Sequence, residues 1–181
     1  MKSLKLTIGA LCALFFLASC SPRLTPFTEQ LYNDFGWNEG QLKQIQFYLS
    51  EDLVMRRQLS AGSSEILSGG KIRVENGRRV EVVTVPRGTP GVFLFSPKRD
   101  HFAISFESDD KYLMFGPNPK AGNRFVLLGS DWSRNGGMVT YGGQKFRVER
   151  NDAFAGLLVN LKKIQKTERQ SRTARGRTVG K

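Results

Sequence analysis

The sequence contains little of the chemistry on which most enzymes and metalloproteins depend. Its 181 residues include one histidine, His101, and two cysteines, Cys12 and Cys20. A single histidine forms no metal site without neighbouring carboxylates and no catalytic triad without a positioned nucleophile. We therefore interpret His101 as a turn residue at the mouth of a hairpin, paired with Asp100 or Asp109, and predict no cofactor and no metal.

The chain also lacks an apolar run long enough to span a bilayer. A spanning helix needs about 20 apolar residues. The apolar run of residues 6–17 is shorter, follows five residues with two lysines, and is succeeded by small residues. A basic start, an apolar stretch and small residues occur in this order in secretory signal peptides.

The residues Leu17-Ala18-Ser19-Cys20 close this run. They resemble the lipobox of bacterial lipoproteins, which is cut just before the cysteine. The resemblance implies that residues 1–19 are removed and that Cys20 carries a diacylglyceryl group on sulfur and an acyl chain on its amine. Two or three chains hold a protein firmly on a membrane, because each buried methylene contributes about 0.8 kcal/mol. It also implies a mature chain with no thiol, which excludes disulfides, Cys-ligated metals and Cys nucleophiles.

The residues after Cys20 predict where the protein is held. Ser21 stands where the inner-membrane retention signal of this family would place an acidic residue, so the resemblance favours a lipid anchor in the outer membrane, facing the periplasm. Residues 20–26 then form the acylated cysteine and a short tether. Six extended residues reach only ~20 Å, so we expect the folded part to lie close to the membrane.

The formal charge of +12 is unevenly distributed along the chain. Residues 162–181 contribute +7 and the signal +2, which leaves +3 for the body. We predict that residues 165–181 form a flexible basic tail, because they hold too few apolar side chains to offset the entropy of ordering. The tail is either a solvated end or a binder of anionic lipid or glycan groups. Its candidate anion-binding residues are Lys166, Arg169, Arg172, Arg175 and Arg177. Nucleic acid is not expected as a partner in this compartment.

The body, residues 27–164, is predicted to be one mainly β domain behind short N-terminal helices. The helical segment is expected from Thr25 to Ile45 and is broken at residues 35–37, where Trp37 covers the junction with the sheet. Asn38 and Gln41 match a capping box for the second helix. Short β-rich segments follow, at 46–50, 53–59, 71–75, 79–85, 92–95, 102–107, 112–115, 124–128, 138–141, 145–149 and 155–161.

Alternation of apolar and polar residues within 102–107 indicates an antiparallel sheet with one wet face. Many short strands without βαβ spacing predict an antiparallel β-barrel or a two-sheet sandwich, with the short N-terminal helices at one side and a disordered basic C-terminal tail. The segment 152–165 also matches a helix face, so a helix competes with a strand there.

No motif in the body predicts a reaction. Residues 131–136 match the first half of a calcium loop, but the twelfth position is Gly142 where a glutamate is needed, so we predict a polar turn between strands. Loops at 86–91 and 115–123 are rich in proline and glycine, and such loops often carry binding surfaces. The candidate binding residues around them are Arg87, Lys120, Arg124 and Trp132.

Three functions remain open at this stage. The first is a non-enzymatic envelope lipoprotein that binds or scaffolds an envelope protein or an anionic glycan or lipid, and the missing catalytic set favours it. The second is an envelope hydrolase or transferase that acts through carboxylates such as Glu51, Asp52, Asp109 or Asp110. The third is a carrier of a lipid or other apolar ligand, although the thirteen phenylalanines are expected to fill the core.

Overall fold

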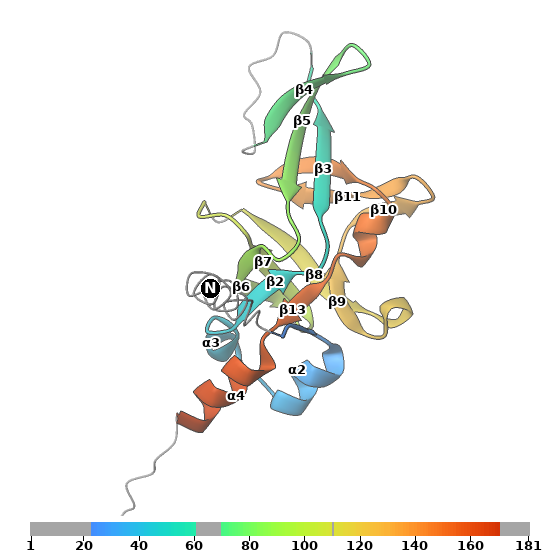
Figure 1. Cartoon of the computed structure of the whole chain (residues 1–181). Helices are drawn as coiled ribbons and strands as arrows, with labels where there is room; N and C mark the ends of the chain where they lie inside the picture. The colour runs from blue at the N-terminus through green and yellow to red at the C-terminus, as the bar shows by residue number, and fades with distance from the viewer. Residues whose placement is uncertain (1–22, 61–69, 110, 171–181) are drawn as a thin grey trace, which may run out of the picture.

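The protein is a mainly β chain built from two antiparallel sheets, which confirms the predicted fold class in its sandwich form (Figure 1). The computed structural model describes residues 23–60, 70–109 and 111–170. Cys20, the signal residues and Asp110 lie outside the described residues. So do Arg172, Arg175 and Arg177 of the predicted tail.

The first sheet has seven strands in the order β1-β13-β2-β6-β7-β8-β9. The bounds are β1 Thr25–Pro26, β2 Gln46–Leu49, β6 Pro90–Lys98, β7 His101–Ser105, β8 Tyr112–Asn118, β9 Arg124–Leu127 and β13 Leu157–Val159. This sheet curls strongly. The edge strand β9 hydrogen-bonds back to the opposite edge, with Phe125 N–H donating to Phe27 O (2.9 Å) and Leu127 N–H to Ala155 O (2.8 Å). Within the described ranges these are local bridges, and they do not close a barrel.

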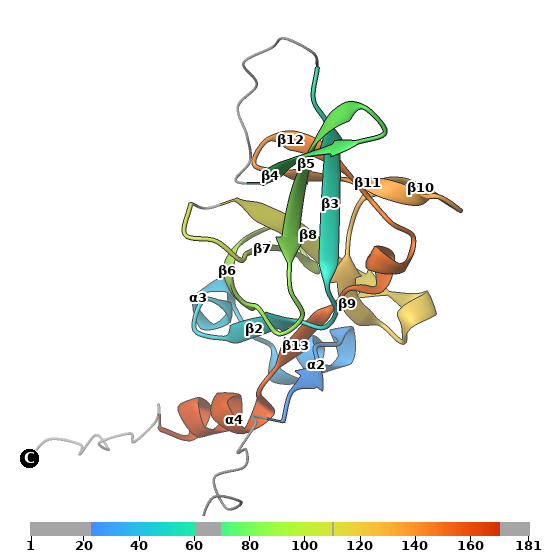
Figure 2. The ribbon, with the colours of Figure 1, turned by 45° about the horizontal axis from the view of Figure 1, so that its top comes forward.

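The second sheet has six strands in the order β10-β11-β12-β3-β5-β4. The bounds are β3 Leu53–Gln58, β4 Lys71–Glu75, β5 Arg78–Val85, β10 Ser130–Ser133, β11 Gly136–Tyr141 and β12 Gln144–Val148. The hairpin of β4 and β5 turns at Asn76 and Gly77, both with positive φ, as the sequence predicted. This hairpin and the adjoining part of β3 project beyond the first sheet in both views (Figures 1 and 2).

Short helices cover the opposite end of the molecule. The helices α2 (Glu29–Phe35) and α3 (Glu39–Leu42) are separated at Gly36, whose φ of 60° ends the first helix. The predicted capping box is present, because Gln41 N–H donates to Asn38 Oδ1 and Asn38 N–H to Gln41 Oε1. Short 3-10 turns, η1 (Pro119–Ala121) and η2 (Asn151–Phe154), complete the body.

Phenylalanine rings fill the inside of the curled first sheet. Phe27 is fully buried and contacts Phe47 and Phe125 with ring centroids 5.3 Å and 4.9 Å away. Trp37 stacks on Phe27 at 5.8 Å and covers the junction between helices and sheet. Each such ring stabilises the fold by roughly 1.5–3 kcal/mol through burial. The buried phenylalanines therefore form the core, as expected. Phe93 and Phe95 also line an open hollow of about 560 Å³ beside Tyr112.

Three expectations for local structure were wrong. Thr25–Pro26 is a strand rather than the start of a helix, because it pairs with β13. Residues 130–133, predicted as part of a polar turn, form the strand β10 in a hairpin with β11. The predicted strand 155–161 is shorter, and the helix α4 (Leu161–Gln170) follows it. The Lys163 N–H donates to Asn160 Oδ1, and Ile164 is buried against the core, so α4 continues past the expected start of the tail at residue 165.

Candidate functional site

The basic residues of the body are concentrated in the second sheet. Its strands contain eight lysines and arginines and three acidic residues, whereas the strands of the first sheet contain only Lys98 and Arg124 among lysines and arginines. The strands of the second sheet therefore carry a net +5 and those of the first sheet a net +2. The fold thus gathers positive charge on the second sheet, although the body as a whole carries only +3.

The strand register places six of these cations on one side of the second sheet. Arg147 pairs with Arg56, Arg56 with the buried Val82, and Val82 with Lys71, so these side chains share one side of the sheet across four strands. Residues two apart in a strand share a face. The basic face, as we name this surface, therefore consists of Arg56, Lys71, Arg73, Arg78, Lys145 and Arg147.

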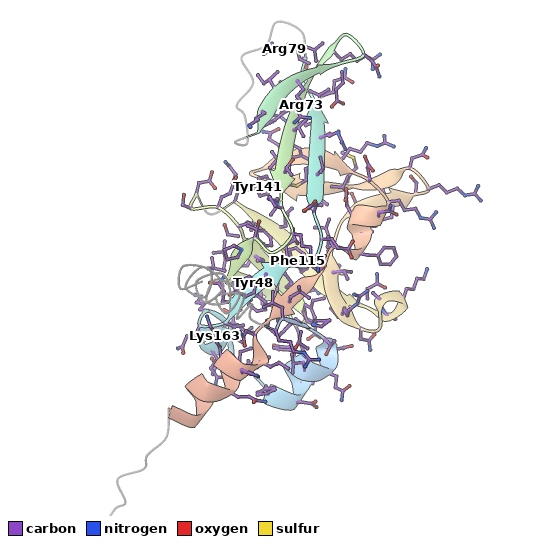
Figure 3. All side chains as sticks on the ribbon, in the orientation of Figure 1. Tyr48, Arg73, Arg79, Phe115, Tyr141 and Lys163 are labelled. Atoms are coloured by element: carbon purple, nitrogen blue, oxygen red, sulfur yellow. The ribbon has the colours of Figure 1, made fainter. Side chains whose placement is uncertain are left out.

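The other side of β3, β5 and β12 faces the core. Met55, Val83 and Phe146 alternate with the cations and are buried. Arg56, Lys145 and Arg147 therefore have core packing behind their strands, whereas Lys71 and Arg73 lie on the projecting strand β4, whose other side is exposed at Ile72 and Val74. Figure 3 shows Arg73 on the projecting β4–β5 hairpin, at the end of the molecule opposite Lys163 of α4.

A hollow of about 470 Å³ lies in the basic face. We name it the arginine hollow. Its cationic rim includes Arg56, Lys145 and Arg147, and Val80 and Met138 supply apolar lining. An adjoining hollow of about 390 Å³ shares Arg56 and Arg147 and is bounded by Asn135 and Glu149. The two hollows meet at the pair of arginines.

Carboxylates partly neutralise this pair. The Arg56 Nη1 lies 3.1 Å from Glu149 Oε1, and its Nε lies 4.0 Å from Glu75 Oε1. Arg147 Nη2 donates to the Asn135 carbonyl oxygen at 3.2 Å. The Glu149 side chain is 69% exposed, so its ion pair with Arg56 is screened by water and contributes about 0–1 kcal/mol. This ion pair is weak enough for a bound anion to replace it.

A buried ion pair holds the strands beneath the basic face. The Glu81 carboxylate is fully buried and accepts hydrogen bonds from Arg57 Nη2 (2.7 Å), Arg57 Nε (3.1 Å) and the Gly70 N–H (3.2 Å). The Arg57 guanidinium also lies over the Phe146 ring, 5.7 Å from its centroid. These contacts join β3, β5, β12 and the start of β4, so we assign the pair a structural role.

A second polar cluster joins the two sheets. The buried Tyr141 hydroxyl of β11 donates to Glu107 Oε2 at 2.5 Å, and Lys111 forms ion pairs with Glu107 and Asp109. The hydrogen bond with Lys111 lowers the pKa of the Asp109 carboxyl, and the same contact raises the pKa of Lys111. Burial, with the Glu107 hydrogen bond, raises the pKa of Tyr141. These shifts in pKa favour the charged forms of Asp109 and Lys111 and the protonated form of Tyr141.

The four binding residues predicted from the sequence do not lie on the basic face. Arg87 is in the β5–β6 connection, where its backbone N–H donates to Asp52 Oδ1 at 2.7 Å. Lys120 is in η1, and Arg124 Nε donates to the Ala121 carbonyl at 2.9 Å, which closes that turn. Trp132 is on β10, 39% exposed.

A glycine allows the Trp132 ring to lie against the neighbouring strand. A Cβ at Gly137 would be 2.5 Å from the indole, so only glycine leaves room for the ring at this position. The four predicted residues lie in three separate segments: the β5–β6 connection, η1 with the start of β9, and β10. Among the residues that the structure describes, no hydrogen bond or ion pair joins these segments through the four side chains. We therefore do not treat them as one surface.

The structure also shows the surroundings of His101, which the sequence predicts to pair with Asp100 or Asp109. His101 begins β7, and its Nδ1 lies 3.3 Å from the Arg99 carbonyl oxygen rather than beside Asp109, which pairs with Lys111. Within residues 23–60, 70–109 and 111–170, no group of three or more His, Cys, Asp or Glu side chains is arranged to hold a metal ion. No helix in these ranges is long and apolar enough to cross a membrane.

Sequence reasoning missed the basic face for an identifiable reason. Arg56, Arg147 and Lys71 are far apart in the chain, and only the register between strands brings them into one row. Alternation in Gln144-Lys145-Phe146-Arg147-Val148 was the available signal, because it places two cations on one side of a strand. Comparisons with known proteins add nothing to this site: no protein-family model, curated protein or solved structure matches the chain.

Proposed function

We propose that the protein is a lipid-anchored lipoprotein of the bacterial envelope, held in the outer membrane because Ser21 is not the acidic residue of an inner-membrane retention signal, and that its β domain is a non-enzymatic binding module. We further propose that the basic face binds an anionic glycan, a polymer that carries phosphate or carboxylate groups. The observation that carries the proposal is the set of six cations that four strands, β3, β4, β5 and β12, place on one side of the second sheet.

The physical basis is the attraction of a fixed array of cations for a polyanion. Each lysine or arginine near an anionic surface contributes about 1 kcal/mol, and the attraction decays within a Debye length of about 8 Å at physiological salt. Binding to a polyanion also releases counterions, so it weakens steeply as salt is added. A rigid sheet holds its cations in place before binding, so less side-chain entropy is lost than in a flexible tail.

The position of the anchor supports a glycan rather than the lipid of the anchoring membrane. The strand β1 begins at Thr25, shortly after the predicted acylated Cys20, and lies at the end of the molecule with α2 and α4 (Figures 1 and 2). The projecting β4–β5 hairpin, which carries Arg73 and Lys71, lies at the other end. A short tether therefore directs the basic face away from the membrane that holds the anchor.

Binding to an immobilised polyanion tests the glycan proposal. The full chain is passed over dextran sulfate, with neutral dextran as the control matrix, at several salt concentrations. We expect the triple variant R56Q/K145Q/R147Q to bind at least tenfold more weakly than the wild type at 0.15 M salt, because three contributions of about 1 kcal/mol are removed. Unchanged binding by the triple variant would reject the basic face as the binding surface.

A truncated chain separates the basic face from the tail. The chain should end at Gln170, because α4 extends to that residue and Ile164 is buried in the core. A chain that ends at Ile164 would cut the helix and confuse loss of binding with loss of packing. We expect the chain ending at Gln170 to keep most of its affinity for dextran sulfate. If it loses as much affinity as the triple variant, the tail is the binding element instead.

The anchor is tested by C20A. We expect this variant to be unacylated and to leave the membrane fraction, because the acyl chains supply the attachment. The measurement is fractionation of cells in parallel with detection of the acyl group by mass spectrometry. Detergent-dependent membrane partitioning that persists in C20A would reject lipidation at Cys20.

A further inference from the structure

We infer that the arginine hollow is a discrete site for one phosphate ester group of the glycan, and that Glu149 is an intramolecular competitor for that site. The inference rests on the proposed function, because it names the chemical group that the basic face recognises. It goes beyond that function by assigning recognition to one pair of arginines rather than to the overall charge of the face.

The first observation is that Arg56 and Arg147 are direct cross-strand partners. Directly opposed residues in an antiparallel pair have Cβ atoms about 4.5–5.5 Å apart, and like charges in these positions are destabilising. Replacing either arginine by a neutral residue would relieve this repulsion. An anion bound between the two guanidinium groups also relieves the repulsion, and the anion gains a favourable contact with each arginine.

The second observation is the geometry of the donors around the hollow. A guanidinium has five N–H donors in a planar fork that matches a phosphate in a bidentate way. The two arginines share the rim with Lys145, which lies two residues before Arg147 and so projects on the same side of β12. Arg56, Lys145 and Arg147 thus line one hollow together with Arg57, Gln58 and a single carboxylate, Glu75. The apolar side chains of Val80 and Met138 in the same lining reduce water around a bound anion.

The third observation is that a carboxylate already contacts one of the arginines. Glu149, which bounds the adjoining hollow, places its Oε1 3.1 Å from Arg56 Nη1, and a bound phosphate oxygen would compete for the same guanidinium. Glu75 lines both hollows and lies farther away, 4.0 Å from Arg56 Nε. The main chain of Glu149 is fixed, because its N–H donates to Asp152 Oδ2 at 2.8 Å. The side chain is mostly in water, so it can turn away at little cost. Glu149 therefore lowers the affinity of the hollow for weak anions.

The charge of the ligand favours a phosphate monoester over a carboxylate. A monoester carries about −1.5 to −2 at pH 7 and presents three strong acceptor oxygens. A carboxylate ligand carries one negative charge and two acceptor oxygens. The Glu149 carboxylate already gives Arg56 a contact of this kind. Only an anion of higher charge gains enough from the three cations to replace the ion pair between Arg56 and Glu149.

The test is an NMR titration of the full chain at constant ionic strength, following the Arg Nε–Hε signals. The probes are glucose 1-phosphate, glucose and inorganic phosphate. For wild type we expect saturable binding of glucose 1-phosphate at least as tight as that of inorganic phosphate, and none of glucose. Binding of inorganic phosphate without glucose 1-phosphate would overturn the assignment to an ester and identify free phosphate as the ligand.

Three single variants decide whether the site is discrete. R147Q should weaken glucose 1-phosphate binding at least tenfold, and E149Q should strengthen it about threefold or more. K98Q is the matched control, because Lys98 is on β6 of the first sheet and loses the same charge but belongs neither to the basic face nor to the lining of the hollow. We expect it to change the affinity less than twofold. Equal losses in K98Q and R147Q, or no gain in E149Q, would overturn the inference.

Failure of the inference can be distinguished from failure of the proposed function. Wild type that binds dextran sulfate through the basic face but shows no saturable phosphate signal would keep the function and reject the discrete site. Wild type that binds glucose 1-phosphate with the expected variant pattern but does not bind dextran sulfate would support the site and reject the glycan polymer.

Discussion

The hydrogen bond between Tyr141 and Glu107 offers a direct test of how the two sheets are joined. Tyr141 is on β11 of the second sheet, and Glu107 follows β7 of the first. The variant Y141F removes one hydroxyl and keeps the buried ring. Any change in stability therefore reports the hydrogen bond of 2.5 Å rather than the packing of the side chain.

The expected magnitude follows from the burial of the two partners. A hydrogen bond to a charged group contributes about 1.5–3 kcal/mol. The Glu107 side chain is 39% exposed, so its carboxylate regains water when the hydroxyl is lost. We therefore expect the lower end, about 1.5 kcal/mol. For a chain of this size 1 kcal/mol shifts the Tm by about 2–4 °C, so the expected fall in Tm is about 3–6 °C.

Thermal and urea unfolding followed by circular dichroism would measure this change. The matched control is Y112F, because Tyr112 is a half-exposed tyrosine of the first sheet and its loss of a hydroxyl should change stability by less than about 0.5 kcal/mol. Since the pKa of Tyr141 is raised, the hydroxyl stays protonated at pH 6 and pH 9, and the effect should be equal at both. A loss below about 0.5 kcal/mol in Y141F would refute the assigned role.

Two further predictions concern the core and the end of β12. F27A should lower the free energy of unfolding by about 3–5 kcal/mol, measured by urea unfolding, because Phe27 is fully buried among aromatic rings; a loss below 1 kcal/mol would contradict this packing. Burial raises the pKa of Asp152 above its ordinary 3.8, so its contribution to stability is present below pH 3.8 and is lost as pH rises through the folded value. D152N keeps an oxygen that can accept from the Glu149 N–H, and its stability should not fall in this way as pH rises. Urea unfolding midpoints of the wild type and D152N, measured from pH 3 to pH 6, check the prediction. Parallel curves for the two chains would show that Asp152 is not the group that titrates.

The N-terminal part of the fold shows how far local signals reach. The capping box at Asn38 and Gln41 was predicted from four neighbouring residues, and it forms because both partners belong to one turn of helix. The β4–β5 hairpin was likewise predicted from Asn76 and Gly77, which adopt positive φ. The strand β10 was missed because Ser130–Ser133 is polar on both sides, and only its pairing with β11 makes it a strand.

The helix α4 shows where local sequence signals are not sufficient. The sequence allows a strand over residues 155–161 or a helix over 152–165, and the structure contains a shorter strand followed by a helix. The helix depends on Asn160 capping and on burial of Ile164 against the core. The sequence by itself determined the mainly β class, because alternation and turn residues are local properties. It also carries the lipobox resemblance at Cys20, which remains a prediction. Only the tertiary structure decided that Arg56 and Arg147 lie side by side, because the register between distant strands depends on how the whole core packs.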